Sequence, residues 1–287
     1  MNLLQKAKAA WREDNLLRRV VKNSGILSSS NFIAAGLSFI QGILIARMLG
    51  ASDLGVVTTI ITFATTINNL LSFRMSEVLV RYFNAAVAEG KKEEASAIAK
   101  GAGMTEVVTS LVAFLILFLL APWGARTFAR DASVAPLFLF YGLTLFSNLI
   151  YETSRGILQA HRRFGQFAAV YLLQTILTLL LIAGAFFTSS GSMGFVLAAY
   201  LAGKTLAGIV IIVLAIRTLN ENLPGWWRVP LRTYCGWRAL FGFALNTNLN
   251  GTVTLFVRDS IRFISPCSLE RRRSVTSRLP SALLPCS

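Results

Sequence analysis

Six long apolar stretches, separated by short polar segments, lie between residues 25 and 216 and constrain the fold more than any other feature. Each comes close to the ~20 residues that an α-helix needs to cross the hydrocarbon core of a bilayer. Because 54% of the residues are hydrophobic and only 14% are charged, the composition is not that of a soluble domain. The sequence therefore predicts an all-α membrane protein with a six-helix N-terminal bundle. The predicted spans are roughly 25–46, 54–73, 104–123, 134–151, 167–187 and 193–216.

Lys and Arg residues fall almost wholly on one side of this predicted bundle. The segments outside the spans fall, in chain order, alternately on the two sides of the membrane. The segments of one side carry eighteen Lys and Arg residues and are 1–24, 74–103, 152–166 and 217–239. The segments of the other side carry three and are 47–53, 124–133 and 188–192. Short loops rich in Lys and Arg stay in the cytoplasm. We therefore expect a multi-pass protein of the inner (plasma) membrane, with the lipid bilayer around it and a cytoplasmic N-terminus.

The formal net charge of +15 does not indicate a nucleic-acid partner. Nucleic-acid binding needs cations clustered on one folded soluble face, whereas here they sit in loops beside the predicted spans. His161 is the only histidine, and the cysteines lack the spacing of metal ligands. We therefore expect no metal site, no cofactor and no enzymatic activity.

The segments outside the spans predict further organisation. Residues 1–24 are a basic cytoplasmic leader, and residues 217–239 are a cytoplasmic linker between two lobes. Residues 74–103 alternate Ala and Ile with Lys and Glu, which predicts a cytoplasmic helix broken near Gly90. A compact turn around Gly50 joins the first two spans.

A seventh apolar segment, 240–257, is short for a span and carries Asn246, Asn248 and Asn250. It can insert only beside neighbours that satisfy its amides, so we expect an incomplete seventh span. Residues 258–287 have a different character, with many Ser, Arg and Pro residues and no apolar run. One explanation is a re-entrant or uninserted seventh segment, and the other is that the tail does not belong to the native reading frame. We favour the second and expect an irregular tail.

Several motifs together resemble the polysaccharide-biosynthesis membrane proteins. These are the Wzx-type flippases of the multidrug/oligosaccharidyl-lipid/polysaccharide exporter superfamily. One mark is the first pair of spans, in which an arginine closes the first span and a Leu-Gly-x-x-Asp-Leu-Gly turn follows, namely Arg47, Leu49, Gly50, Asp53, Leu54 and Gly55. Another is the loop between spans four and five, with Gly156-Ile-Leu-Gln-Ala followed by Arg163-Phe. The resemblance covers about residues 20–260.

The resemblance implies a fold of two six-helix bundles that enclose a central cavity, of which this chain supplies one lobe. It implies a transporter that moves polyprenyl-pyrophosphate-linked oligosaccharide across the inner membrane for surface polysaccharides such as O-antigen. Its partners would be that lipid-linked oligosaccharide and other glycan-export membrane proteins. Because the chain departs from the two-lobe pattern after about residue 260, we expect a truncated or frameshifted member of the family. An inactive truncated remnant is the alternative.

Lys204 is the first candidate for the substrate path. It lies near the middle of the sixth span, where a charge costs about 2.5–3.5 kcal/mol on insertion scales and is a functional candidate by default. A pyrophosphate load needs such a cation, and we expect Lys204 to line a central groove that faces spans one and two. Gly203 and Gly208 beside it would allow close helix approach. The alternative is that Lys204 pairs with an acid or extends to the interface.

Five further residues are candidates for substrate binding. Arg47 and Arg258 end the first and seventh segments and could ring the outer mouth, although Arg47 is equally explained as an interfacial anchor. Gln41, Asn68 and Asn69 place amides within spans one and two. Hydrogen bonding between helices is the alternative explanation for these amides.

Two other functions compete with the flippase. A drug or cation antiporter of the same fold would normally carry acids deep in the spans, whereas Glu106 and Glu152 sit at span edges. A membrane glycan polymerase or ligase would need a large outer loop with acid–base residues. The outer loops here are about ten residues long at most, so we rank both functions below the flippase.

Overall fold

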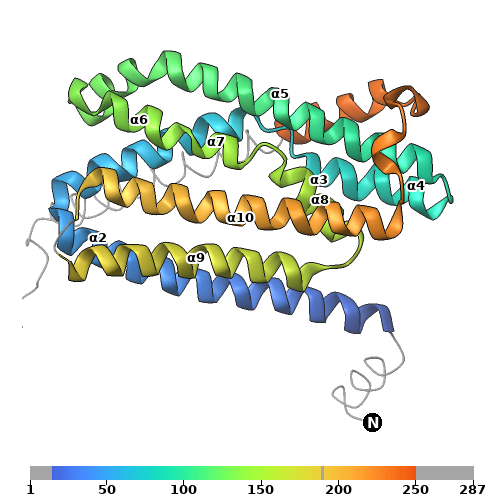
Figure 1. Cartoon of the computed structure of the whole chain (residues 1–287), viewed down its shortest axis with the longest axis horizontal. Helices are drawn as coiled ribbons and strands as arrows, with labels where there is room; N and C mark the ends of the chain where they lie inside the picture. Colours follow the sequence, from blue (N-terminus) through green and yellow to red (C-terminus); the bar gives the residue numbers. More distant parts are fainter. Residues whose placement is uncertain (1–14, 189–190, 250–287) are drawn as a thin grey trace, which may run out of the picture.

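The computed structural model describes residues 15–188 and 191–249, and the regular structure of these residues is helical, with no strand among them (Figure 1). The predicted all-α fold is therefore confirmed for this part of the chain. Most of the leader, the second half of the seventh segment, Arg258 and the tail lie outside the described residues.

The first two predicted spans form the two arms of α2 (Asn15–Leu71), which is interrupted and reverses direction at Gly50. Gly50 has φ 79° and ψ 175°, a backbone conformation that side chains with a Cβ rarely adopt. Figure 1 shows the two arms of α2 leaving this turn, the first along α9 (Phe164–Phe187) and the second behind α6 and α10. The predicted turn around Gly50 is therefore confirmed.

The predicted break near Gly90 is also confirmed. The segment consists of α3 (Met75–Val78), a π-helical turn (Leu79–Phe83) and α4 (Asn84–Ala88), after which α5 (Lys92–Gly124) begins. Gly90 has φ 75°, and the N–H groups of Lys91 and Gly90 donate to the carbonyls of Ala86 and Val87. This is the Schellman pattern, which ends a helix at a left-handed glycine.

The fourth span is not the single helix predicted over 134–151. It is divided into α6 (Ala135–Gly142), α7 (Thr144–Ser147) and α8 (Tyr151–Ala160), with irregular backbone at 148–150. A broken helix frees backbone N–H and C=O groups, and at membrane depth these must find partners inside the protein. The partners of the freed N–H groups define the site described below.

The sixth span, α10 (Met193–Asn222), packs closely against the fifth span, α9, at one glycine and against the fourth span at another. A Cβ at Gly203 would lie 2.2 Å from Thr178 Oγ1 on α9, and a Cβ at Gly208 would lie 2.5 Å from the Ser147 carbonyl oxygen of α7. The close approach predicted beside Lys204 is therefore confirmed, and it requires glycine at these two positions.

The segment after α10 is held against α5. The ammonium of Lys100 donates hydrogen bonds to the carbonyls of Trp227 and Val229 at 2.8 and 2.6 Å. The ring of Trp237 lies over Gly101, where a Cβ would be 2.0 Å from it. Residues 237–249 are helical. The described half of the seventh segment packs against the first six spans, because it contributes to the same buried apolar cluster.

Figure 1 shows alternate connections at opposite ends of the bundle. The start of α2, α4 and the end of α10 lie at one end, and the turn of α2 and the α5–α6 and α9–α10 connections lie at the other. Within residues 15–188 and 191–249, five helical segments are long and apolar enough to cross a membrane, and the turn at Gly50 divides the first into two arms. The connections rich in Lys and Arg therefore share one end, as expected for a multi-span membrane protein.

Two of the three buried apolar clusters in the described part of the chain follow one another along α5. From the start of α5, one cluster takes Ala95, Ile98, Ala99 and Ala102, and the other takes Ala113, Leu117, Ala121 and, just after the helix, Ala125. Between them, at 106–110, α5 buries Glu106 and Ser110 instead of apolar side chains. A polar layer therefore lies between two apolar clusters.

Candidate substrate cavity

The polar layer contains a cavity of about 490 Å³. The end of α2, α3, α5, the broken fourth span and the seventh segment enclose it, and its lining is rich in amides, hydroxyls, carboxylates and guanidinium groups. Its polar lining residues are Asn68, Asn69, Ser72, Arg74, Ser76, Glu77, Glu106, Thr109, Ser110, Asn148, Tyr151, Glu152, Arg155, Gln159 and Asn248.

One face of α5 supplies a buried side of the cavity. Glu106, Thr109, Ser110 and Ala113 line it, at the i, i+3, i+4, i+7 spacing of a single helical face. In an otherwise apolar span this stripe directs polar groups inward, as expected where a span borders an aqueous or substrate-filled space.

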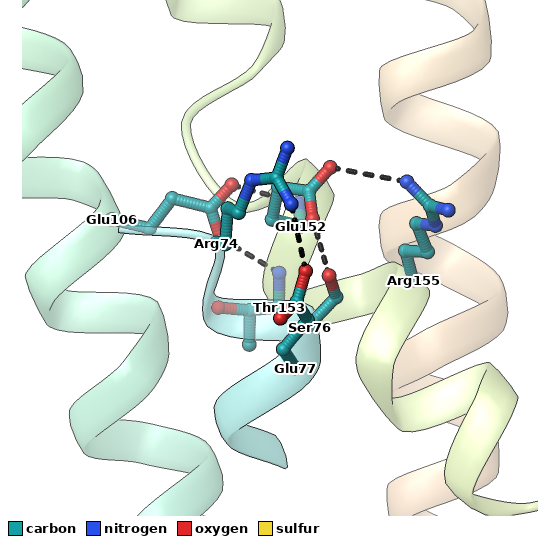
Figure 2. Close-up of polar contacts among 7 residues, drawn as sticks. All are labelled: Arg74, Ser76, Glu77, Glu106, Glu152, Thr153 and Arg155. Carbon is teal, nitrogen blue, oxygen red and sulfur yellow. Dashed lines mark hydrogen bonds and ion pairs between the residues drawn. The ribbon is translucent and has the colours of Figure 1, made fainter. Parts of the chain in front are cut away.

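Glu106 joins α5 to the start of α8. Its two carboxylate oxygens accept hydrogen bonds from the backbone N–H groups of Glu152 and Thr153 at 2.7 and 2.8 Å (Figure 2). The first N–H groups of a helix have no partner within the helix, and the residue before α8, Ile150, has no side chain that can cap it. The Glu106 carboxyl group therefore caps α8 from another helix.

Glu152 extends this network to α3. Its carboxylate accepts a hydrogen bond from the Ser76 hydroxyl at 2.5 Å, and Arg155 Nη1 donates to it at 3.4 Å. The guanidinium of Arg155 also lies 5.0 Å from the ring centre of Phe167 on α9. Side chains from α3, α5, α8 and α9 are thus linked around the cavity.

Arg74 lies at a more open part of the lining. It has φ 46° at the start of α3, and its Nη1 donates to Glu77 Oε1 at 3.0 Å. About half of each side chain is exposed, 48% for Arg74 and 47% for Glu77. Exposed pairs of this kind exchange readily with water or a ligand, since they contribute little to stability.

Asn248 of the seventh segment completes the lining. Its side-chain amide donates a hydrogen bond to the Ser72 carbonyl, just after the end of α2. The expectation that this segment needs neighbours to satisfy its amides is therefore confirmed for Asn248. The seventh segment forms part of the cavity wall.

The structure brings two of the predicted site residues to the cavity and places two others elsewhere. Asn68 and Asn69 line it. Gln41 is buried between helices, where its amide donates to the Thr175 carbonyl at 2.8 Å and its oxygen accepts from Tyr200 at 3.4 Å. Arg47 is exposed near the turn of α2, at the opposite end of the lobe.

Lys204 is half-buried on α10, with its ammonium 5.3 Å from the ring centre of Tyr141 on α6. A cation over an aromatic face is favoured where water is scarce. Lys204 thus faces the fourth span at this point, and it is not among the residues that line the cavity. Its place on the substrate path stays a prediction.

Sequence reasoning missed Arg74, Ser76 and Arg155 and placed Glu106 and Glu152 only at span edges. The helical spacing of polar residues at 106, 109 and 110 was a signal that could have identified the α5 face. In the described part of the chain, no group of three His, Cys, Asp or Glu side chains is arranged to hold a metal ion.

Residues 20–265 match the family described as "Polysaccharide biosynthesis protein". The chain is 23% identical over 154 residues to the inner membrane protein YghQ of Escherichia coli (strain K12). This alignment covers 54% of the chain and 43% of YghQ. No solved structure matches the chain significantly.

Proposed function

Because the chain belongs to the polysaccharide biosynthesis protein family, we propose that it forms one lobe of a flippase for polyprenyl-pyrophosphate-linked oligosaccharide. The lobe would lie in the inner membrane with a cytoplasmic N-terminus, and the load would move from the inner to the outer leaflet. Alternating access of this kind requires a second lobe or bundle, against which this one can rock.

The observation that carries the proposal is the polar cavity within a membrane lobe. A volume of about 490 Å³ lies within the usual range of about 300–1,000 Å³ for small-ligand sites. The cavity lies beside a discontinuous span, which is where transporters commonly place their substrates.

The lining suits a saccharide. Sugar hydroxyls both donate and accept hydrogen bonds, and the amides of Asn68, Asn148 and Asn248 can do the same. The carboxylates of Glu77 and Glu152 add strong acceptors, and the hydroxyls of Ser76 and Tyr151 add groups with both roles.

Arg74 and Arg155 would bind the pyrophosphate. Guanidinium groups bind phosphate oxygens in a bidentate manner, and both arginines line the cavity. Each is currently paired with a glutamate three residues away, Glu77 and Glu152 respectively. An arriving phosphate would therefore displace one weak, partly exposed ion pair at each arginine.

The proposal is tested by measuring export of surface polysaccharide in cells whose export depends on this chain. Asn68→Ala and Arg74→Ala should each reduce export about tenfold, because each removes one or more hydrogen bonds to the load. Asn84→Ala is the matched control, since Asn84 is an amide on α4 that donates to the Val80 carbonyl away from the cavity. Normal export in both cavity variants would refute the proposal.

An ion-coupled antiporter of the same fold is the second candidate, and one observation favours it. Glu77, Glu106 and Glu152 place three carboxylates around one cavity, although the sequence suggested only acids at span edges. Uptake of a fluorescent cationic drug into inverted vesicles, driven by a proton or sodium gradient, separates the two candidates. Gradient-driven uptake lost in Glu152→Gln would favour the antiporter.

A further inference from the structure

The connection from α10 to the seventh segment forms a strap, residues 223–238, that packs against α5. It contains two 3₁₀ turns, Trp226–Arg228 and Leu231–Thr233. Lys100 of α5 donates hydrogen bonds to one carbonyl of the first turn and to the carbonyl just after it. Trp237 closes the strap, because its Nε1 donates to the first carbonyl of the second turn at 3.1 Å. The position of Lys100 along α5 therefore sets the position of the strap.

The exposed apolar band of α5 gives the level of Lys100 relative to the membrane. Exposed apolar side chains run along this candidate span from Met104 to Trp123. At ~1.5 Å per residue the helix rises about 29 Å between them, which matches the ~30 Å hydrocarbon core of a bilayer. Lys100 lies one turn before Met104, about 6 Å further along the axis, and the head-group layer adds about 5–8 Å on each side of the core. The strap therefore lies at the level of the lipid head groups.

The strap carries only positive charge. Its charged residues are all arginines and all exposed, namely Arg228, Arg232 and Arg238. Residues 222–249 contain no Asp or Glu, and no ion pair in the described part of the chain involves these three arginines. The acids near the strap have other partners, since Glu221 pairs with Arg163 and Glu94 pairs with Lys91. The three guanidinium groups are therefore available to an external anion.

Trp227 adds an amphipathic ring to this basic surface. Its side chain is 58% exposed, and the guanidinium of Arg228 lies 4.6 Å from its ring centre. A Trp ring is stable where lipid head groups meet the hydrocarbon core, because its apolar body and its polar N–H are both accommodated there. The exposed ring thus has the chemistry expected of a side chain at this level.

We propose that the strap binds the head groups of anionic phospholipids, with its three arginines on the phosphate groups and Trp227 as an anchor. Guanidinium groups bind phosphate oxygens in a bidentate manner, and basic segments beside a span attract anionic lipids. Phosphatidylglycerol has one net negative charge and suits this surface. Phosphatidylcholine also carries a cation, which the arginines repel. The inference does not depend on what the lobe transports.

The test uses the exposed thiol of Cys235, which lies within the strap. A fluorescent dye is attached to it in the full chain, with Cys267 and Cys286 replaced by Ser. The labelled chain is placed in phosphatidylcholine nanodiscs that contain a small fraction of nitroxide-labelled phosphatidylglycerol or phosphatidylcholine, and quenching of the dye by the two lipids is compared. Phosphatidylglycerol should be preferred about tenfold or more, since each basic residue near an anionic surface raises affinity about fivefold.

The double variant Arg232→Gln/Arg238→Gln should lower this preference at least fivefold, whereas Arg232→Lys/Arg238→Lys should keep most of it because the charges remain. Lys91→Gln/Lys92→Gln is the matched control. It removes two exposed cations from the same end of the lobe, but Lys92 lies about 18 Å from Met104 along α5, beyond the head-group layer. The control should therefore leave the lipid preference unchanged.

Equal quenching by the two lipids in the original chain, or equal losses in the two glutamine variants, would overturn the inference. Excess inorganic phosphate should not reduce the quenching by phosphatidylglycerol. If it does, the arginines form a site for free phosphate and not for a membrane surface. A nitroxide beside the head group should quench more strongly than one at the end of the acyl chain. The opposite order would place the strap inside the hydrocarbon core and would also refute the proposal.

Discussion

The carboxylate of Glu106 accepts the backbone N–H of Glu152 at 2.7 Å, across 46 residues of sequence. The same carboxylate accepts the N–H of the next residue, so α5 supplies the cap that α8 lacks. The broken fourth span is therefore stabilised by a side chain from another span. The polar cavity lies beside this contact.

Replacing Glu106 by Ala should destabilise the lobe. It leaves two buried N–H groups without acceptors, each at a cost of about 1–3 kcal/mol. Glu106→Gln should cause an intermediate loss, because its amide keeps only one acceptor oxygen. Apparent melting temperatures of the purified protein in detergent measure both effects. Glu93→Ala, at an exposed position near the start of α5, should change nothing; equal stability of all three variants would contradict the capping role.

Gly203→Ala should force α9 and α10 apart. Its Cβ would lie 2.2 Å from Thr178 Oγ1, and overpacking of this kind costs about 1–3 kcal/mol. Gly184→Ala on α9 is the control, because its Cβ meets nothing within 4 Å. Removing the hydroxyl with Thr178→Ala should largely rescue Gly203→Ala. A strictly additive double variant in melting experiments would show that the two residues are not coupled.

The orientation of the lobe is tested by reporter fusions. Fusions after Gly90 and after Arg217 should report the cytoplasm, because their segments carry many Lys and Arg residues. Fusions after Asp53 and after Ser190 should report the outside. The opposite result at any two sites would reverse the orientation.

Lys204 is predicted to act on the load through its charge. Lys204→Ala should impair polysaccharide export more than Lys204→Arg, since only the arginine keeps a cation for the pyrophosphate. Its position over Tyr141 supplies a structural alternative, and Tyr141→Leu tests it. If both Lys204 variants export normally, or if Tyr141→Leu alone reproduces the Lys204→Ala defect, Lys204 is a structural residue.

The helical architecture could be predicted because the positions of spans and of glycine breaks depend on residues that are close together in the sequence. Gly50 and Gly90 adopt the positive φ values that end or reverse a helix, and both breaks were visible in the sequence. The divided fourth span was not, since residues 134–147 contain no charged or amide side chain and only isolated hydroxyls, at Tyr141, Thr144 and Ser147. Its break depends on Glu106, whose side chain replaces the missing intrahelical partners from another span.

The site was only partly predictable for the same reason. Asn68 and Asn69 were recognised because amides are rare in spans, and they line the cavity. Gln41 has the same chemistry but bonds to Thr175 between helices, which no single-sequence pattern distinguishes. Arg74 and Arg155 were counted with the cytoplasmic segments outside the spans, and only the packing of α3 and α8 against α5 brings them to the cavity.

The apolar cluster beyond residue 113 of α5 also has an electrical consequence. It separates the cavity from the end of the lobe that carries the turn of α2. Most of the transmembrane voltage drops across a dry apolar barrier and little of it drops across a space filled with water. A charge that leaves the cavity toward that end therefore crosses nearly the whole voltage. Each such charge gains or loses about 2.3 kcal/mol per 100 mV. In the proposed orientation, an inside-negative membrane would itself drive an anionic pyrophosphate outward.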